Sequence, residues 1–266
     1  MRQPTNSLAA YDYFLRGRSL LANRSGSDRG RMVAEARSMF EKSLAADADY
    51  APAVEGLAEA YNIIWLEHSD SRATYDEHRN PTTLQRALDL ADRAILLNPY
   101  SANGYITRAY ILHWLYRRDD AREDVKKSLE FNQNQSDGRI GHMMMHTGRA
   151  QEALDLFPNA LRYDPFPPSI YLSWQGNSFY LLSRFEESFR TLTRGSERMP
   201  TYRSMFVWLA AVAATAKHMD DARHAAAKVT TQQPSFTIRA WLDFIRLPEC
   251  DGNLFAEGLW RAGLAP

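Results

Sequence analysis

The feature that most constrains this chain is a repeat of about 34 residues, marked by proline. Similar stretches recur as AILLNPYSA, NALRYDPFPP, GSERMPTYR and KVTTQQPSFT, and EFNQNQ fills the gap between the first two. The marked positions, Pro99, Gln133, Pro165, Pro200 and Pro234, are separated by 34, 32, 35 and 34 residues. A period of this length is typical of solenoids, in which each repeat buries its apolar face against its neighbours.

Each interval carries two helical patterns. Before the proline comes an Ala-x3-large-x2-small spacing, as in Ala153, Phe157 and Ala160, which marks one face of a helix that the proline ends. Upstream lies a second apolar pattern with a small residue between large ones, as at Gly176 and Phe179. The small residue allows close approach, so each repeat predicts a pair of packed helices.

This pattern resembles the tetratricopeptide repeat family, whose W-x2-L-G-x2-Y, A-x3-F and final P are matched six times in degenerate form. The resemblance implies an all-α fold, a right-handed superhelical solenoid of about six helix pairs, with about thirteen helices in all. We predict one solenoid domain over residues 1–266, with capping helices over 235–266. The repeats span about 8–48, 49–99, 100–133, 134–165, 166–200 and 201–234.

An insertion over residues 62–86 interrupts the second repeat. Its start, NIIWLEH, continues a helical pattern, and Asn80-Pro81-Thr82 restarts one. We therefore expect a lengthened helix followed by a loop beside the groove mouth. The acids and imidazoles of this loop make it the second place to look for a metal: His68, Asp70, Asp76 and His78.

The stretch GHMMMH places His142 and His146 four residues apart, on one face of a helix. Two histidines with this spacing share a metal in H-E-x-x-H helices, but Met143 replaces the glutamate here. Two imidazoles alone make an incomplete site, so we predict no bound metal and no cofactor. In the repeat register Met144 is a core residue, and both histidines face the groove.

The same register predicts the partner-binding groove. Trp and Tyr provide large contact areas at low entropic cost, so this set favours a protein or peptide partner. Two alternatives stay open, namely ordinary packing between repeats and a groove that binds a small ligand. The predicted groove residues are Glu59, Asn62, Tyr110, His113, Trp114, His142, Met145, His146, Asn177 and Tyr180.

Composition argues against several classes of function. The chain has 32 basic and 32 acidic residues, without the basic excess of a nucleic-acid binder. Cys250 is the only cysteine, which excludes an intrachain disulfide and suits the reducing cytoplasm. No apolar run approaches the roughly 18 residues of a membrane span, so we expect no membrane insertion.

Catalytic motifs are missing as well. The paired acids Asp119-Asp120, Glu186-Glu187 and Asp220-Asp221 fall near predicted turns, where they favour the N-terminus of the next helix. The chain has no G-x-S-x-G elbow and no Cys-His arrangement. We therefore predict a chain that is not an enzyme and has no catalytic residues.

Three sequence segments suggest a narrower relationship. AYDYFLRGRSLL, DPFPPSIYLSWQGNSFYLLSRFEESF and FAEGLWRAGLAP resemble the repeat tail of bacterial class III adenylate/guanylate cyclases. This resemblance implies a regulatory or docking arm of a protein that makes a cyclic nucleotide, although the chain itself has no room for the catalytic domain. Similar tails occur on winged-helix transcriptional regulators, which is the alternative. Assembly as a homodimer is also open.

Overall fold

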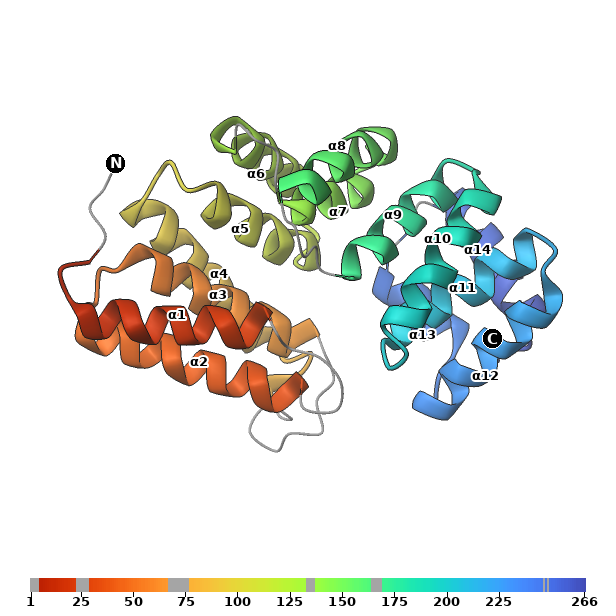
Figure 1. The fold of residues 1–266 in the computed structure, drawn as a ribbon, viewed down its shortest axis with the longest axis horizontal. Helices are drawn as coiled ribbons and strands as arrows, with labels where there is room; N and C mark the ends of the chain where they lie inside the picture. The colour runs from red at the N-terminus through yellow and green to blue at the C-terminus, as the bar shows by residue number, and fades with distance from the viewer. Residues whose placement is uncertain are drawn as a thin grey trace. The chain divides into compact units, whose positions relative to one another are not determined.

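A computed structural model describes residues 5–22, 29–66, 77–132, 137–163, 169–245, 247 and 249–266. Within these ranges the chain forms fourteen α-helices and no β-strand, which confirms the predicted all-α class (Figure 1). The chain divides into two compact units, residues 1–133 (unit 1) and residues 134–266 (unit 2). The single domain over residues 1–266 stays a prediction. No helix of the described segments is both long and apolar enough to cross a bilayer.

Unit 1 consists of three helix pairs. The members of each pair pack closely together, and the second helix of one pair also packs against the first helix of the next. The pairs are α1 (Leu8–Ala22) with α2 (Arg29–Ala46), α3 (Ala51–Leu66) with α4 (Pro81–Leu97), and α5 (Ala102–Trp114) with α6 (Arg118–Phe131).

Unit 2 repeats this arrangement and then adds two helices. Its pairs are α7 (Gly138–His146) with α8 (Ala150–Tyr163), α9 (Ile170–Leu181) with α10 (Phe185–Arg198), and α11 (Arg203–Thr215) with α12 (Met219–Gln232). The predicted C-terminal helices follow as α13 (Ile238–Ile245) and α14 (Glu249–Arg261). Of these two, α14 packs against both α13 and α11.

The restart of helix after the insertion follows the predicted signal. The side chain of Asn80 accepts a hydrogen bond from the backbone N–H of Thr82, and Pro81 occupies the first helical turn of α4. At the other end of the insertion, α3 continues to Leu66. The predicted loop and its candidate metal ligands His68, Asp70 and Asp76 lie outside the described residues.

Small residues mark the points of closest helix approach, as the repeat pattern predicts. A Cβ atom added at Gly17 would lie 2.6 Å from the ring of Phe40 in α2. One added at Gly176 would lie 2.6 Å from the side chain of Leu192 in α10. Both large side chains are fully buried, so the glycines let them fill the space between paired helices.

Four of the tight turns between paired helices share one backbone conformation. Each contains a residue with positive φ, namely Tyr116, Gly148, Ser183 and Lys217. The next residue donates its N–H to a carbonyl five positions earlier, as from Arg149 to Met144 at 2.8 Å. This hydrogen bond and the left-handed residue are the usual way to end an α-helix. The turns therefore repeat along the chain even where their sequences differ.

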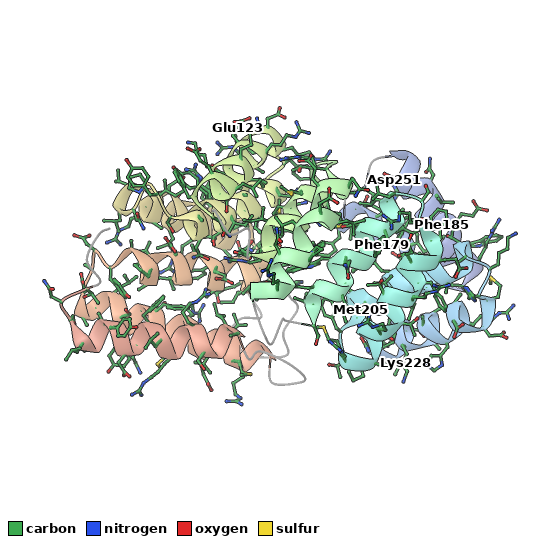
Figure 2. The ribbon with its side chains drawn as sticks, turned by 45° about the horizontal axis from the view of Figure 1, so that its top comes forward. Glu123, Phe179, Phe185, Met205, Lys228 and Asp251 are labelled. Atoms are coloured by element: carbon green, nitrogen blue, oxygen red, sulfur yellow. The ribbon has the colours of Figure 1, made fainter. Side chains whose placement is uncertain are left out.

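The paired acids lie in the first turns of α6, α10 and α12. There their negative charge interacts favourably with the positive end of the helix dipole. In α10, Arg184 forms two hydrogen bonds with Glu187, at 2.6 and 2.5 Å, and this contact lowers the pKa of that carboxyl. The guanidinium of Arg184 also lies 4.6 Å from the ring centre of Phe179, which Figure 2 labels beside Phe185. These acids have a structural role at the turn.

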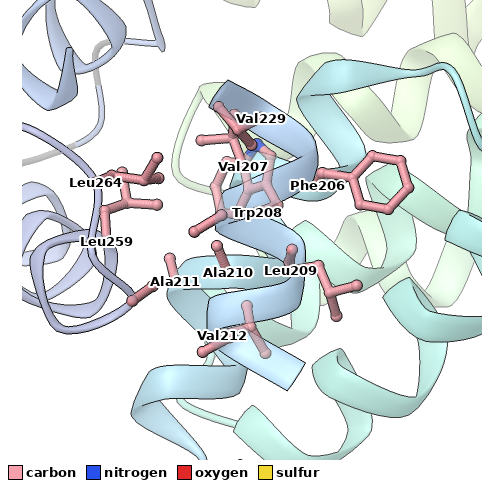
Figure 3. Packing of buried hydrophobic residues seen from close by; sticks show 14 of the residues in the cluster. Phe206, Val207, Trp208, Leu209, Ala210, Ala211, Val212, Val229, Leu259 and Leu264 are labelled. Carbon is pink, nitrogen blue, oxygen red and sulfur yellow. The ribbon is translucent and has the colours of Figure 1, made fainter. Parts of the chain in front are cut away.

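The core of unit 2 is centred on α11, whose residues 205–214 are all buried. Helices α10, α12 and α14 all pack against it. Figure 3 shows Leu259 and Leu264 of the C-terminal segment beside Ala211, whereas Phe206 points to the opposite side. A helix that is apolar all round needs such cover on every side.

Candidate recognition surface

The ten predicted groove residues differ in how far a partner can reach them. Glu59, Tyr110, His142 and His146 keep part of their surface exposed. The other six are buried: Asn62, His113, Trp114, Met145, Asn177 and Tyr180. Within the predicted set, the accessible surface is therefore limited to Glu59 and Tyr110 in unit 1 and to His142 and His146 in unit 2.

In unit 1, polar side chains around the predicted groove residue Glu59 pair across neighbouring helices. Arg18 of α1 forms an ion pair with Glu59 of α3 at 3.0 Å. One turn away on α3, the buried Glu55 accepts a hydrogen bond of 2.7 Å from the amide of Asn103 in α5. Burial of a carboxylate is costly without such partners. These two contacts connect the first helices of all three pairs, and we call them the polar ladder.

The C-terminal ends of α3 and α5 carry an aromatic group. The rings of Trp65 and Trp114 have centroids 6.0 Å apart, and His113 meets Trp114 edge-on at 4.7 Å. The guanidinium of Arg79 lies 4.6 Å from the ring centre of Trp65. Both indoles and the imidazole are buried. This group therefore stabilises the C-terminal ends of α3 and α5 and offers a partner little contact area.

Unit 2 instead carries a stack of aromatic rings on α7 and α9. His142 stacks on Trp174 with centroids 4.6 Å apart and an angle of 21° between the planes. Trp174 stacks in turn on Tyr171 at 5.3 Å. The Nε2 atoms of His142 and His146 lie 3.2 Å apart, so one imidazole donates a hydrogen bond and the other accepts it. We call these four residues the aromatic platform.

Half of the aromatic platform was not predicted from the sequence. Tyr171 and Trp174 lie three residues apart on one face of α9, a spacing that was a detectable signal. Gly138 brings α7 and α9 close together, because its missing Cβ would lie 2.5 Å from the Tyr171 ring. Its N–H also donates a 3.2 Å hydrogen bond to the Tyr171 hydroxyl. Both new residues are half-buried, so the platform keeps accessible area.

Further along unit 2, α14 packs against α11. The close-approach residue Ala210 is followed by Ala211, as Gly176 is followed by Asn177. A Cβ added at Gly258 of α14 would lie 2.6 Å from the carbonyl oxygen of Ala211, so the two backbones are in contact. The sequence predicted capping helices over 235–266 after the last full repeat, but not which atoms of α11 they meet.

Tyr180 lies beneath this cover. Its ring meets Phe255 of α14 edge-on at 5.6 Å and Trp208 of α11 at 5.8 Å. Burial raises the pKa of the Tyr180 hydroxyl above its ordinary value of 10.0, although the hydroxyl of Thr215 opposes this shift. Tyr180 therefore stays neutral and belongs to the packed interior in this structure.

The chemistry available on these surfaces is stacking and hydrogen bonding. Among the described residues, no three histidine, cysteine or acidic side chains come together as a metal site would require. The platform contributes two such side chains, His142 and His146, and their imidazoles form a hydrogen bond with each other.

Comparison with known proteins extends only to solved structures, because no family model and no curated protein matches the chain. A Parabacteroides merdae tetratricopeptide repeat protein aligns with 96% of this chain and 92% of its own, at 14% identity and a TM-score of 0.52. The human IFIT1 dimer with m7Gppp-AAAA aligns with 96% of this chain and 60% of its own, at 14% identity and a TM-score of 0.64.

The Cut9-Hcn1 hetero-tetramer of the APC/C is similar as well, over 96% of this chain and 46% of its own, at 16% identity and a TM-score of 0.61. The chain thus spans less than two thirds of the IFIT1 and Cut9-Hcn1 chains. At these identities the similarity concerns the fold alone. Together with the paired helices and their repeated turns, it identifies this chain as a protein with the tetratricopeptide repeat fold.

Proposed function

We propose that this chain is a non-catalytic module that binds a protein or peptide partner, with the aromatic platform as its main contact. The observation that carries the proposal is the half-exposed stack of His142, Trp174 and Tyr171 on two neighbouring first helices. Rigid aromatic rings give a partner large contact area at low entropic cost. A partner would contact the accessible edges of the stacked rings, since each ring face of Trp174 meets another ring.

The predicted groove residues of unit 1 form a separate candidate contact. Glu59 and Tyr110 offer polar contacts in unit 1, and the buried members of the set hold the surrounding backbone in place. The Cut9-Hcn1 assembly supports a protein partner, because there a similar fold binds another protein. IFIT1 holds m7Gppp-AAAA in a similar fold, which makes nucleic acid the competing class. The balance of 32 basic and 32 acidic residues favours the protein partner.

A finer proposal concerns the setting of this module. The sequence segments AYDYFLRGRSLL, DPFPPSIYLSWQGNSFYLLSRFEESF and FAEGLWRAGLAP support a regulatory arm of a class III adenylate/guanylate cyclase. A similar arm of a winged-helix regulator is the alternative. None of the three structural relatives reported above is a cyclase, so these sequence segments alone support the cyclase setting. The DNA upstream of the codon for Met1 tests it. A reading frame that encodes neither a cyclase nor a DNA-binding domain would remove the support.

The binding proposal is tested by selecting displayed peptides against the full chain and measuring the affinity of the winners by calorimetry. Trp174→Ala and the double variant His142→Ala/His146→Ala should each weaken binding about tenfold, or roughly 1–2 kcal/mol. His224→Ala is the matched control, because it removes an exposed imidazole of α12 outside the platform. Peptides that bind all four proteins equally well would show that the platform is not the recognition surface.

A further inference from the structure

The C-terminal helices leave an apolar surface of their own. An open hollow of about 420 Å³ lies between α13 and α14, lined mainly by Ile238, Leu242, Ala256 and Trp260. Trp260, at the edge of this hollow, is 65% exposed. Tryptophan is enriched among the residues that dominate interface energies. The α13–α14 surface therefore has the composition of an interface.

Charges on this surface are arranged so that it complements itself. On α14, Glu257 and Arg261 flank Trp260 and form an ion pair of 2.5 Å. On α13, Arg239 and Asp243 line the other side of the hollow with the same spacing and opposite charges. A two-fold axis across α14, between residues 257 and 261, would bring each acid opposite the base of a second copy. Trp260 of each copy would then face the hollow between α13 and α14 of the other copy.

We propose that the α13–α14 surface is a homodimer interface, in which Trp260 of each copy enters the hollow of the other. An isologous interface needs a protruding group and its receptor on the same patch, and both are present here. Complementary charges on the rim would set the antiparallel register and disfavour other partners. This dimer is independent of peptide binding at the aromatic platform, which lies on α7 and α9.

Sedimentation of the full chain over a dilution series tests the proposal, and the wild type should approach the mass of two chains. Trp260→Glu should raise the dissociation constant about 30-fold or more, as expected for a dominant interface residue. Leu96→Glu is the matched control, since it replaces an exposed apolar side chain of α4 outside this surface. Circular dichroism melts confirm that each variant folds.

Charge reversal gives a second test that does not depend on Trp260. Glu257→Arg places like charges opposite each other across the axis and should weaken the dimer roughly tenfold. Adding Arg261→Glu restores opposite charges and should restore the dimer. A wild type that stays monomeric at all concentrations, or a dimer indifferent to both Trp260→Glu and Glu257→Arg, would overturn the proposal.

Discussion

Units 1 and 2 use the same repeat register but carry different side chains at the predicted groove positions. In unit 1, the positions that follow the close-approach residues carry Arg18 and Glu59, which bond to each other across helices. In unit 2, the corresponding positions carry His142 in the aromatic platform and then Ala211, which α14 covers. One backbone pattern thus supports a polar ladder, an open aromatic stack and a closed apolar contact.

The comparison separates what the repeat needs from what it leaves free. The small residues and the large residues that fill the space between paired helices recur in both units, because paired helices cannot approach without them. The groove positions tolerate charge, aromatic rings or methyl groups, since no neighbour within the pair constrains them. Differences between the units at these positions are therefore the best guide to function.

The covered face of unit 2 should be the most sensitive to change. Phe255 is fully buried against Tyr180 and Trp208, so Phe255→Ala should lower the free energy of unfolding by about 3–5 kcal/mol. Urea denaturation followed by circular dichroism measures this loss. Asn253→Ala, on the exposed side of α14, is the control and should change stability by less than about 0.5 kcal/mol. Equal losses would mean that α14 is not part of the core.

Two glycines of α14 sharpen the same point. Gly258→Ala places a Cβ against the backbone of Ala211 and should cost about 1–3 kcal/mol. Gly252→Ala meets open space and should stabilise the helix by about 0.5–1 kcal/mol. Thermal melts of the two variants should therefore shift in opposite directions. Shifts of the same sign would contradict the close backbone contact.

The polar ladder of unit 1 should respond less strongly. Asn103→Ala removes the hydrogen bond that the amide donates to buried Glu55, which should cost roughly 1.5 kcal/mol. The ion pair of Arg18 with Glu59 is more exposed, so Arg18→Ala should cost less, about 0.2–1 kcal/mol. Denaturation curves compare the two variants directly. A larger loss for Arg18→Ala would reverse the assigned roles.

The sequence predicted the helix pairs well, because the constraints of the repeat are local. Proline, small residues and cap residues such as Asn80 determine where helices end and how closely they approach. The register also predicted that His142 points toward the groove, and its side chain is partly exposed. The partner of His142 was missed, because stacking on Trp174 depends on the approach of α9 to α7.

The sequence predicted capping helices over 235–266 but not which face of α11 they meet. The segment RSMFVWLAAVAAT of α11 is buried throughout residues 205–214. Such a helix needs a further layer of cover, and this signal was present in the sequence. Which segment supplies that layer depends on long-range contacts that periodicity does not encode.

The smallest expected effect concerns the turn pair Arg149–Glu152, whose equivalent in unit 1 is Arg117–Asp120. The hydrogen bond from Arg149 lowers the pKa of Glu152 below its ordinary 4.5. The pair therefore stabilises the fold above pH 4.5 and loses this effect as the pH falls through the lower value of the folded state.

Glu152→Gln should thus cost no more than about 0.5 kcal/mol at neutral pH, because solvent screens this exposed pair. Once the pH falls below the lowered pKa of Glu152 in the folded state, the variant and the wild type should converge, since the carboxyl is then protonated in both the folded and the unfolded protein. Melting temperatures across this range measure the difference. A gap that widens in acid would contradict the assigned sign.

Hydrogen exchange of the full chain with and without a selected peptide tests the central claim most directly, because it locates binding without a substitution. We expect slower exchange in α7 and α9, around His142 and Trp174, and unchanged exchange in α14 and in the part of α11 that α14 contacts. Protection confined to unit 1 or to the α13–α14 surface would contradict the assignment of the aromatic platform as the recognition surface.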